Sequence, residues 1–445
     1  MSISRSFFSL LFFVSLFLVP MVRAGERERA IATEPVPLAY CASGDRERRF
    51  IIVDKSSQTL RLFRSPKSVD SAYSSARAAP LALQALYPVI LGSKQGDKRT
   101  QGDLRTPEGL YHIQRWLPGQ TLPIRYGLGA FTLDYPGYLD RLHGKTGNGI
   151  WIHGINPRQD KFDTKGCVAL SNENLQLLKN TIHADTPVLI TPKLAWGSEN
   201  ERQARYGQWR DRTLQWLAAW EQGDLEQFSG FYSKKFPRRA GFLANKKNVW
   251  RTYPVRSLAL GPVEVYLENG HEVIVRFSHM YMADNLKEWG ERILYWQKEE
   301  NGSFKIVAQQ WRNQGDVITN LFADSPILDT PENTVFNLWQ KIRSLVTTDF
   351  SSDFAPMLHS AYRTSGSRWG LSLSQMRDIA SQPKNNVSLS SPVGGLVDEH
   401  TLLLSFRIAV QTTHGRSRQG KIILVLRKEA GVFRVAHDFY YPEES

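Results

Sequence analysis

The sequence predicts a mainly-β domain followed by two α+β units, and three observations support this fold class. The 445 residues suffice for about three domains of ordinary size. Short apolar runs separated by turn residues fill the stretch from residue 50 to residue 195, which is typical of a β-rich domain. The chain beyond residue 200 contains an internal repeat. Hydrophobic residues make up 41% and charged residues 22%, a globular composition that excludes a fibrous or disordered chain.

The N-terminus has the features of a secretory signal peptide. A positively charged start precedes an apolar run over residues 7–19, and small residues precede a predicted cleavage site between Ala24 and Gly25. An uncleaved membrane anchor is the alternative, but this run is shorter than the about 20 residues that a membrane span requires. We therefore expect residues 1–24 to be removed and the mature protein to be soluble and exported.

Positive charge is in excess, with 56 Lys and Arg against 43 Asp and Glu and a formal net charge of +13. Nucleic acid is one partner for such a chain, but export argues against it. An anionic polymer outside the cytoplasm, such as cell wall, fits better. The alternative is that the charge serves only solubility.

Turn residues and apolar runs outline the first domain. Residues 25–49 form a polar leader with Pro35 and Pro37, which we expect to pack loosely. Residues 50–195 are predicted as one domain that opens with a β-hairpin. Its further expected elements are strands near 86–91, 110–116 and 149–153, a helix over 172–182 and a closing strand over 187–191.

The internal repeat divides the rest of the chain into units over residues 200–315 and 325–445. At an offset of 129 residues, the apolar run 271–277 falls on 400–406. Two earlier aromatic positions match at an offset of 126, and a three-residue insertion reconciles the two offsets. Each copy opens with a helical stretch and ends in a long hairpin, so we expect two α+β units.

Cys167 and His153 are the candidate reactive pair. A cysteine attacks as a thiolate, and it needs a nearby base or a lowered pKa. His153 ends a predicted strand 14 residues before Cys167, and a loop of that length can bring the two together. Gly166 leaves the backbone beside the thiol open, so neighbouring N–H groups could form an oxyanion hole. The dipole of the helix that begins near residue 171 would favour the thiolate.

The alternatives are a structural His153 and a Cys167 that is inert or disulfide-bonded to Cys41, the second cysteine of the chain. In that case the protein would be a non-catalytic, wall-binding scaffold. A cytoplasmic type of thiol hydrolase is a further alternative, which the signal peptide opposes. Metal chemistry is not expected, because the ten histidines show no metal-ligand spacing. No cofactor motif is recognised.

His153-Gly154, followed by Thr164-Lys165-Gly166-Cys167, resembles the signature of the L,D-transpeptidase (YkuD-like) catalytic domain. The run GDLRTPEG at residues 102–109 resembles a further element of that family, and the resemblance covers roughly residues 50–192. Many members carry His where this chain has Lys165, and Arg where it has Ala169. These departures leave the nucleophile in place and leave the choice of acceptor open.

The resemblance implies peptidoglycan stem peptides as the substrate. Cys167 would attack the amide between the third stem residue, usually meso-diaminopimelate, and the fourth, a D-alanine, and form a thioester. His153 would donate and accept protons, and the backbone around Gly166 would hold the oxyanion. An amine acceptor would give a 3-3 crosslink, whereas water would give an L,D-carboxypeptidase that trims tetrapeptides to tripeptides for cell-shape control. The predicted substrate-binding residues are Arg158, Lys165, Thr164 and Gly154.

The two C-terminal units resemble NTF2-like domains. The pattern Trp216…Trp220…Phe228…Tyr232…Phe236 is typical of their opening helices. The whole plan resembles the L,D-carboxypeptidases that determine helical cell shape, and it implies a periplasmic protein. The predicted fold class is thus a mainly-β L,D-transpeptidase catalytic domain followed by two α+β NTF2-like domains. These domains would bind a wall fragment or a protein partner, or act as a spacer or homodimerisation module.

Overall fold

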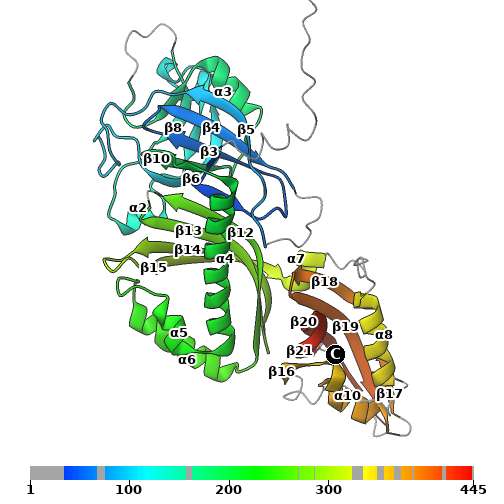
Figure 1. Cartoon of the computed structure of the whole chain (residues 1–445). Helices are drawn as coiled ribbons and strands as arrows, with labels where there is room; N and C mark the ends of the chain where they lie inside the picture. The colour runs from blue at the N-terminus through cyan, green and yellow to red at the C-terminus, as the bar shows by residue number, and fades with distance from the viewer. Residues whose placement is uncertain are drawn as a thin grey trace, which may run out of the picture.

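The computed structural model describes residues 35–67, 76–156, 163–268, 270–284, 286–322, 334–347, 355–364, 372–382, 385–412 and 417–442. The predicted signal peptide over residues 1–24 therefore lies outside the described residues. Within them, every helix is too short or too polar to span a bilayer. Figure 1 shows three parts of the chain in succession, with the blue-to-cyan domain at the top and the orange-to-red unit at the lower right.

The first domain is built on one eight-stranded sheet in the order β5-β4-β3-β10-β6-β7-β8-β9. Its strands are β3 (Arg48–Asp54), β4 (Thr59–Ser65), β5 (Ala82–Pro88), β6 (Gly109–Pro118), β7 (Gly129–Leu133), β8 (Trp151–Gly154), β9 (Val168–Leu170) and β10 (Pro187–Thr191). Most neighbours are antiparallel, but β10 pairs with β3 and β8 pairs with β9 in parallel. The strand expected over 86–91 lies earlier, as β5.

Short helices connect these strands. They are the 3₁₀ turns η1 (Gly119–Thr121) and η2 (Ile124–Tyr126) and the α-helices α2 (Tyr138–Leu142) and α3 (Asn172–Lys179). Helix α3 begins where expected, because the Ser171 hydroxyl accepts a hydrogen bond from the Asn174 N–H. Its Leu175 and Leu178 are fully buried and close the core of the domain. This core holds β8 and β9 in place.

The middle domain is a curved sheet covered by helices. The helices are α4 (Glu199–Gln222), α5 (Leu225–Gly230) and α6 (Arg239–Thr252), and the strands are β12 (Arg256–Glu268), β13 (Glu272–Ala283), β14 (Leu286–Lys298) and β15 (Phe304–Asp316). Figure 1 shows α4 running as one long helix across this sheet. Ser198 and Glu201 form a capping box at its start. Trp216 and Phe228 are fully buried in the core between helices and sheet.

The leader does not pack loosely, so that expectation is wrong for residues 36–42. Strand β2 (Tyr40–Ala42) pairs with β12 as the fifth strand of the middle sheet, and β1 (Val36–Pro37) pairs with β11 (Trp196–Gly197). The three residues of β2 are buried. Burial of Tyr40 and Cys41 supplies the reason, because removing apolar side chains from water favours this docked position.

The last unit repeats the strand plan of the middle one. It contains α7 (Val317–Phe322), α8 (Thr334–Thr347), η3 (Ala355–Met357), β16 (Leu358–Thr364), α10 (Leu373–Ala380), β17 (Asn386–Leu389), β18 (Val393–Asp398), β19 (Thr401–Gln411), β20 (Ser417–Glu429) and β21 (Val432–Pro442). The sheet order is β16-β21-β20-β19-β17, and β18 also pairs with β19. The middle sheet runs β15-β14-β13-β12, so β19, β20 and β21 take the places of β13, β14 and β15.

One pairing supports the repeat in detail. The middle domain has a parallel bridge between Tyr232 and Ile306, and the last unit has a parallel pair between Leu358 and Val435. The first partners lie 126 residues apart and the second partners 129, which are the two offsets seen in the sequence. The structure therefore supports the predicted repeat.

Buried contacts join the first and middle domains. Tyr40 packs on Phe50 of β3 and on Tyr266 of β12, with ring centroids 3.9 and 5.0 Å apart. The Arg48 Nε lies 2.8 Å from the Glu264 carboxylate, and both side chains are buried. Arg48 belongs to the first domain and Glu264 to the middle one, so removing either would leave an unpaired buried charge.

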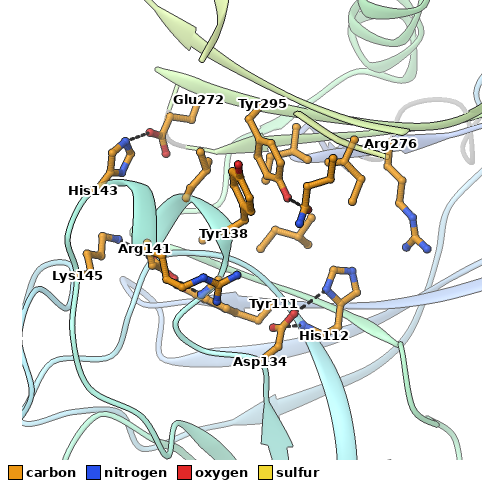
Figure 2. Close-up of a pocket in the computed structure, with 18 of the residues that line it drawn as sticks. Tyr111, His112, Asp134, Tyr138, Arg141, His143, Lys145, Glu272, Arg276 and Tyr295 are labelled. Atoms are coloured by element: carbon orange, nitrogen blue, oxygen red, sulfur yellow. Dashed lines mark hydrogen bonds and ion pairs between the residues drawn. The ribbon is translucent and has the colours of Figure 1, made fainter. Parts of the chain in front are cut away.

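Figure 2 shows a cleft of about 320 Å³ at this junction. His112 lies 3.3 Å from Asp134 on one side of the cleft, and His143 faces Glu272 across the two domains at 3.8 Å. Tyr138 of α2 stacks on Tyr295 of β14. The charged groups of this cleft largely pair with one another.

Candidate active site

Strands β8 and β9 bring His153 and Cys167 to one cavity. The two strands run in parallel, with His153 opposite Ala169, and Cys167 directly precedes β9. Both side chains line a cavity of about 440 Å³. The other lining residues are Ile90, Leu104, Arg125, Tyr126, Ile155, Asp163, Thr164, Lys165 and Ala169. The two residues that the motif singled out are thus placed to act on one bound molecule.

A backbone hydrogen bond sets the tautomer of His153. Its Nδ1 lies 2.6 Å from the carbonyl oxygen of Gly154, which can only accept, so Nδ1 carries the proton. Nε2 is then the unprotonated nitrogen. Burial lowers the pKa of His153, the Gly154 bond raises it, and the positive charge of Arg125 lowers it further. The net effect is a lowered pKa, so the imidazole is neutral near pH 7 and able to accept a proton.

The 3₁₀ turn η2 supplies a second wall of the cavity. The Tyr126 ring meets the His153 ring edge-on, with centroids 5.0 Å apart, and also contacts Trp151 at 4.9 Å. The Arg125 guanidinium lies over the Tyr126 ring at 5.1 Å. These contacts hold the imidazole from the side and bring a cation to the cavity. No motif in the sequence indicated either residue.

The Cys167 thiol is partly buried and unpaired. Its Sγ donates to the carbonyl oxygen of Gly149 at 3.4 Å. Burial raises the pKa of the thiol above its ordinary value of 9.0, while a hydrogen bond from the Trp151 backbone and the charges of Lys98 and Arg125 counteract that effect. The expected lowering by the α3 dipole is therefore wrong for this structure, in which β9 separates Cys167 from the start of that helix.

The loop before Cys167 depends on glycine at position 166. Gly166 has φ of +120°, and a Cβ there would lie 2.5 Å from the Arg105 carbonyl oxygen. The Thr164 hydroxyl accepts from the Gly166 N–H at 3.1 Å and donates to the Cys167 carbonyl at 2.7 Å. Thr164 lines the cavity, but its hydroxyl is committed to the loop. The Gly166 N–H is likewise engaged, which leaves the Cys167 N–H as the candidate oxyanion donor.

Gly154 has a packing role rather than a place on the cavity wall. A Cβ at this position would lie 2.2 Å from the Asn172 Oδ1. That oxygen accepts a hydrogen bond from the Leu128 N–H at 2.9 Å. Asn172, the first residue of α3, thereby ties the segment after η2 to β8. Sequence reasoning missed Asn172, and its only signal was its place at a helix start.

The remaining predicted substrate-binding residues differ in outcome. Lys165 lines the cavity and is exposed, so its ammonium is available to a ligand. Arg158 lies outside the described residues. Ala169, where many family members have Arg, lines the cavity opposite His153.

The charged loop over residues 97–105 is largely self-contained. The Lys98 Nζ lies 2.7 Å from the Asp103 carboxylate, and Lys98 is only 3% exposed. Asp103 also accepts from the backbone N–H groups of Arg99, Thr100 and Arg105. Asp97 pairs with Lys145 at 2.7 Å. These partners leave little of the loop for stem carboxylates and favour the alternative of a structural loop.

Cys41 and Cys167 are both free thiols, so the alternative of a disulfide between them is wrong for this structure. Cys41 is fully buried in the core of the middle domain, where its Sγ donates to the Arg202 carbonyl oxygen at 3.5 Å. Cys167 lies in the cavity of the first domain. The scaffold hypothesis loses the pairing on which it depended.

Two parts of the chain match known families. Residues 48–190 match the family described as the L,D-transpeptidase catalytic domain (YkuD). Residues 48–190 form an L,D-transpeptidase catalytic domain. Residues 209–310 match the Cds6 C-terminal NTF2-like domain. The predicted order of a mainly-β catalytic domain and an NTF2-like domain is thus confirmed, whereas the second NTF2-like domain stays a prediction supported by the repeated strand plan.

Curated and solved relatives agree with this division. The putative L,D-transpeptidase YafK of Escherichia coli is 34% identical over 80 residues, which are 18% of this chain and 29% of YafK. Bd1075 of Bdellovibrio bacteriovorus matches with a TM-score of 0.55 and 25% identity, over 63% of this chain and 99% of its own. The helical cell shape determining protein Pgp2 of Campylobacter jejuni matches with a TM-score of 0.50 and 26% identity, over 62% of this chain and 95% of its own.

Proposed function

We propose that this chain is a peptidoglycan-modifying L,D-transpeptidase that works through a Cys167 thioester. The observation that carries the proposal is that His153 and Cys167 line one cavity, with the unprotonated His153 nitrogen fixed by the Gly154 hydrogen bond. The substrate is the stem peptide, cut between its third residue, usually meso-diaminopimelate, and the D-alanine that follows. Arg125 and Lys165 on the cavity wall provide positive charge for stem carboxylates.

The first half-reaction forms the thioester. His153 Nε2 takes the proton of the Cys167 thiol as Sγ attacks the carbonyl carbon, and the carbonyl oxygen becomes an oxyanion held by the Cys167 N–H. The tetrahedral intermediate then collapses. Its C–N bond breaks, His153 returns the proton to the leaving amine, and D-alanine departs. Because the thiol and the imidazole are both neutral at rest, the proton moves only when substrate is in place.

The second half-reaction depends on the acceptor. The amine of another stem, deprotonated by His153, attacks the thioester, and loss of the thiolate gives a 3-3 crosslink and restores Cys167. Water on the same path gives a tripeptide stem, which is the L,D-carboxypeptidase alternative. The similarity to a cell-shape determining protein over nearly its whole length favours keeping this alternative. The periplasm is the proposed location, because both reactions act on cell wall.

We also propose that the NTF2-like domain binds a wall fragment. Its core contains two cations, Arg292 and Lys246, for which no ion pair with a carboxylate occurs among the described residues. Arg292 is buried, and its guanidinium lies 5.5, 5.1 and 4.8 Å from the rings of Trp216, Trp220 and Trp311. Burial lowers the pKa of Lys246 to about 7. An anionic group would relieve this uncompensated charge.

The deciding experiment is incubation of the exported form with purified disaccharide-tetrapeptide, followed by mass spectrometry. Loss of one D-alanine with free tripeptide product would identify a carboxypeptidase. Dimers that lack one D-alanine would identify a transpeptidase. Absence of both products, with Cys167 alkylatable, would contradict the proposal. The Cys167→Ala variant is the matched control, because it retains the cavity and lacks only the nucleophile.

A further inference from the structure

A separate cleft lies between the NTF2-like domain and the last unit. In Figure 1 these two parts meet at the lower right, away from the catalytic domain at the top. The cleft has a volume of about 610 Å³, which is within the usual range of small-molecule sites. Helix α4 and the first residues of β12 line one side, and β16 and β21 line the other. It therefore exists only because the chain carries the last unit.

Cations outnumber acids on the cleft wall. The charged and titratable residues there are Arg256, Arg363, Arg427, His359, His437, Glu221 and Asp398. Both acids are already engaged: Glu221 accepts from Arg427 at 3.1 Å, and Asp398 accepts from the His400 N–H at 2.8 Å. Arg363 is exposed, and its Nη1 donates to the carbonyl oxygen of the adjacent Tyr362. Its remaining N–H groups are available to an incoming anion.

His437 adds an unsatisfied group to the same wall. Its side chain is only 8% exposed, and its Nδ1 has no hydrogen-bond partner among the described residues. Burial and the charges of Arg427, Arg363 and His359 lower the pKa of His437 to about 3, so its imidazole is neutral. A buried nitrogen without a partner costs free energy that a bound ligand can recover. Strand pairing puts His437 directly beside Arg363.

The opposite wall is apolar. Leu214 and Leu217 of α4 and Leu258 of β12 face the cleft. One cationic wall and one aliphatic wall suit a short organic body that ends in a carboxylate, because a planar carboxylate pairs with guanidinium N–H groups. A long polyanion does not fit an enclosed volume of this size.

We propose that this cleft binds a small carboxylate ligand, with the carboxylate against Arg363 and His437 and the aliphatic body against α4. The carboxylate has two chemical sources, a short acidic peptide or a free organic acid. The site stands on the residues of the cleft, and it does not depend on the reaction at Cys167.

Isothermal titration calorimetry on the full chain tests the site with three probes: N-acetyl-L-alanyl-D-glutamate, hexanoate and inorganic phosphate. We expect a carboxylate probe to bind and Arg363→Gln to weaken it about tenfold, the loss of one charge-assisted pair. His437→Gln should weaken it by a smaller factor. Arg407→Gln, which removes an exposed arginine on β19 outside the cleft, should leave the affinity unchanged.

The probes separate the outcomes. Tighter binding of the dipeptide than of hexanoate supports a peptide ligand, and the reverse order supports a free organic acid. Binding of phosphate alone, no binding of either carboxylate, or carboxylate binding that Arg363→Gln leaves unchanged would overturn the proposal. If His437→Gln does not fold, Arg363→Gln still decides, because the Arg363 side chain is exposed. Thermal unfolding of each variant provides the check on folding.

Discussion

The two cysteines of this chain sit in opposite kinds of surroundings. Cys41 is fully buried in β2, within the core of the NTF2-like domain, and burial raises its pKa to about 12. Cys167 is partly exposed on a cavity that also holds His153. Burial raises the pKa of Cys167 as well, but a backbone N–H and two nearby cations oppose it.

The difference shows what makes a cysteine a nucleophile. Burial alone gives an inert thiol, because the thiolate is disfavoured in apolar surroundings. A base on the same cavity and an open approach for a carbonyl turn a neutral thiol into a reactive one. The comparison can be broken or sharpened by changing each cysteine and its neighbours in turn.

The largest expected effect is on turnover. Cys167→Ala should lower the rate of D-alanine release about 10⁴-fold or more, because no covalent route remains. Cys41→Ala should retain turnover, since Cys41 lies in a different domain from the cavity. Mass spectrometry of the products measures both rates. Normal turnover by Cys167→Ala would show that the comparison, and the proposed mechanism, are wrong.

The next effect tests the base. His153→Gln should lower kcat/KM on the order of 10³-fold, the usual contribution of a general base. In the parent enzyme, only the neutral imidazole accepts a proton, and burial holds the pKa of His153 below 6.5. The rate should therefore be level near pH 7 and fall as the pH drops through that lowered pKa.

Arg125→Gln sharpens the same test. The charge of Arg125 contributes to the low pKa of His153, so its removal should move the acidic limb of the profile to higher pH. Asp163→Asn is a useful contrast, because it removes a charge of opposite sign from the same cavity wall. A pH–rate profile that does not respond to Arg125→Gln would contradict the assigned role of His153 as the base.

Local sequence was enough to find the nucleophile, the base and the repeat. Cys167 and His153 lie within 14 residues of each other, so one loop carries both of them. The repeat was visible because each of its long strands carries many alternating apolar residues. The pairs Tyr232–Ile306 and Leu358–Val435 then reproduce the two offsets.

Features that depend on distant partners were not predictable. Tyr126 reaches His153 through a 3₁₀ turn, and Asn172 fixes that turn from the start of a helix. Strand β2 has only three residues, too few to show an alternating pattern. Lys98 looked like a ligand for substrate, but a sequence does not show that Asp103 neutralises it. The wrong expectations share this cause.

Alkylation should separate the two thiols by a smaller factor. Iodoacetamide should modify Cys167 about 100-fold faster than Cys41 in the native protein, because the thiolate reacts and Cys41 is both buried and of higher pKa. The rate at Cys167 should rise with pH, since its pKa lies above 9.0. Peptide mapping assigns the label, and the unfolded protein should show two reactive thiols. Equal labelling of both sites in the native state would remove the contrast.

The smallest effect is on stability, and it reverses the ranking of the two cysteines. Cys41→Ser places a hydroxyl in an apolar core and should cost about 1–3 kcal/mol. Cys167→Ser should cost less, because its side chain already lines a cavity. Thermal unfolding should therefore show a Tm several degrees lower for Cys41→Ser. An unchanged Tm would mean that the docking of β2 on the NTF2-like sheet contributes little, and that the leader is not part of that core.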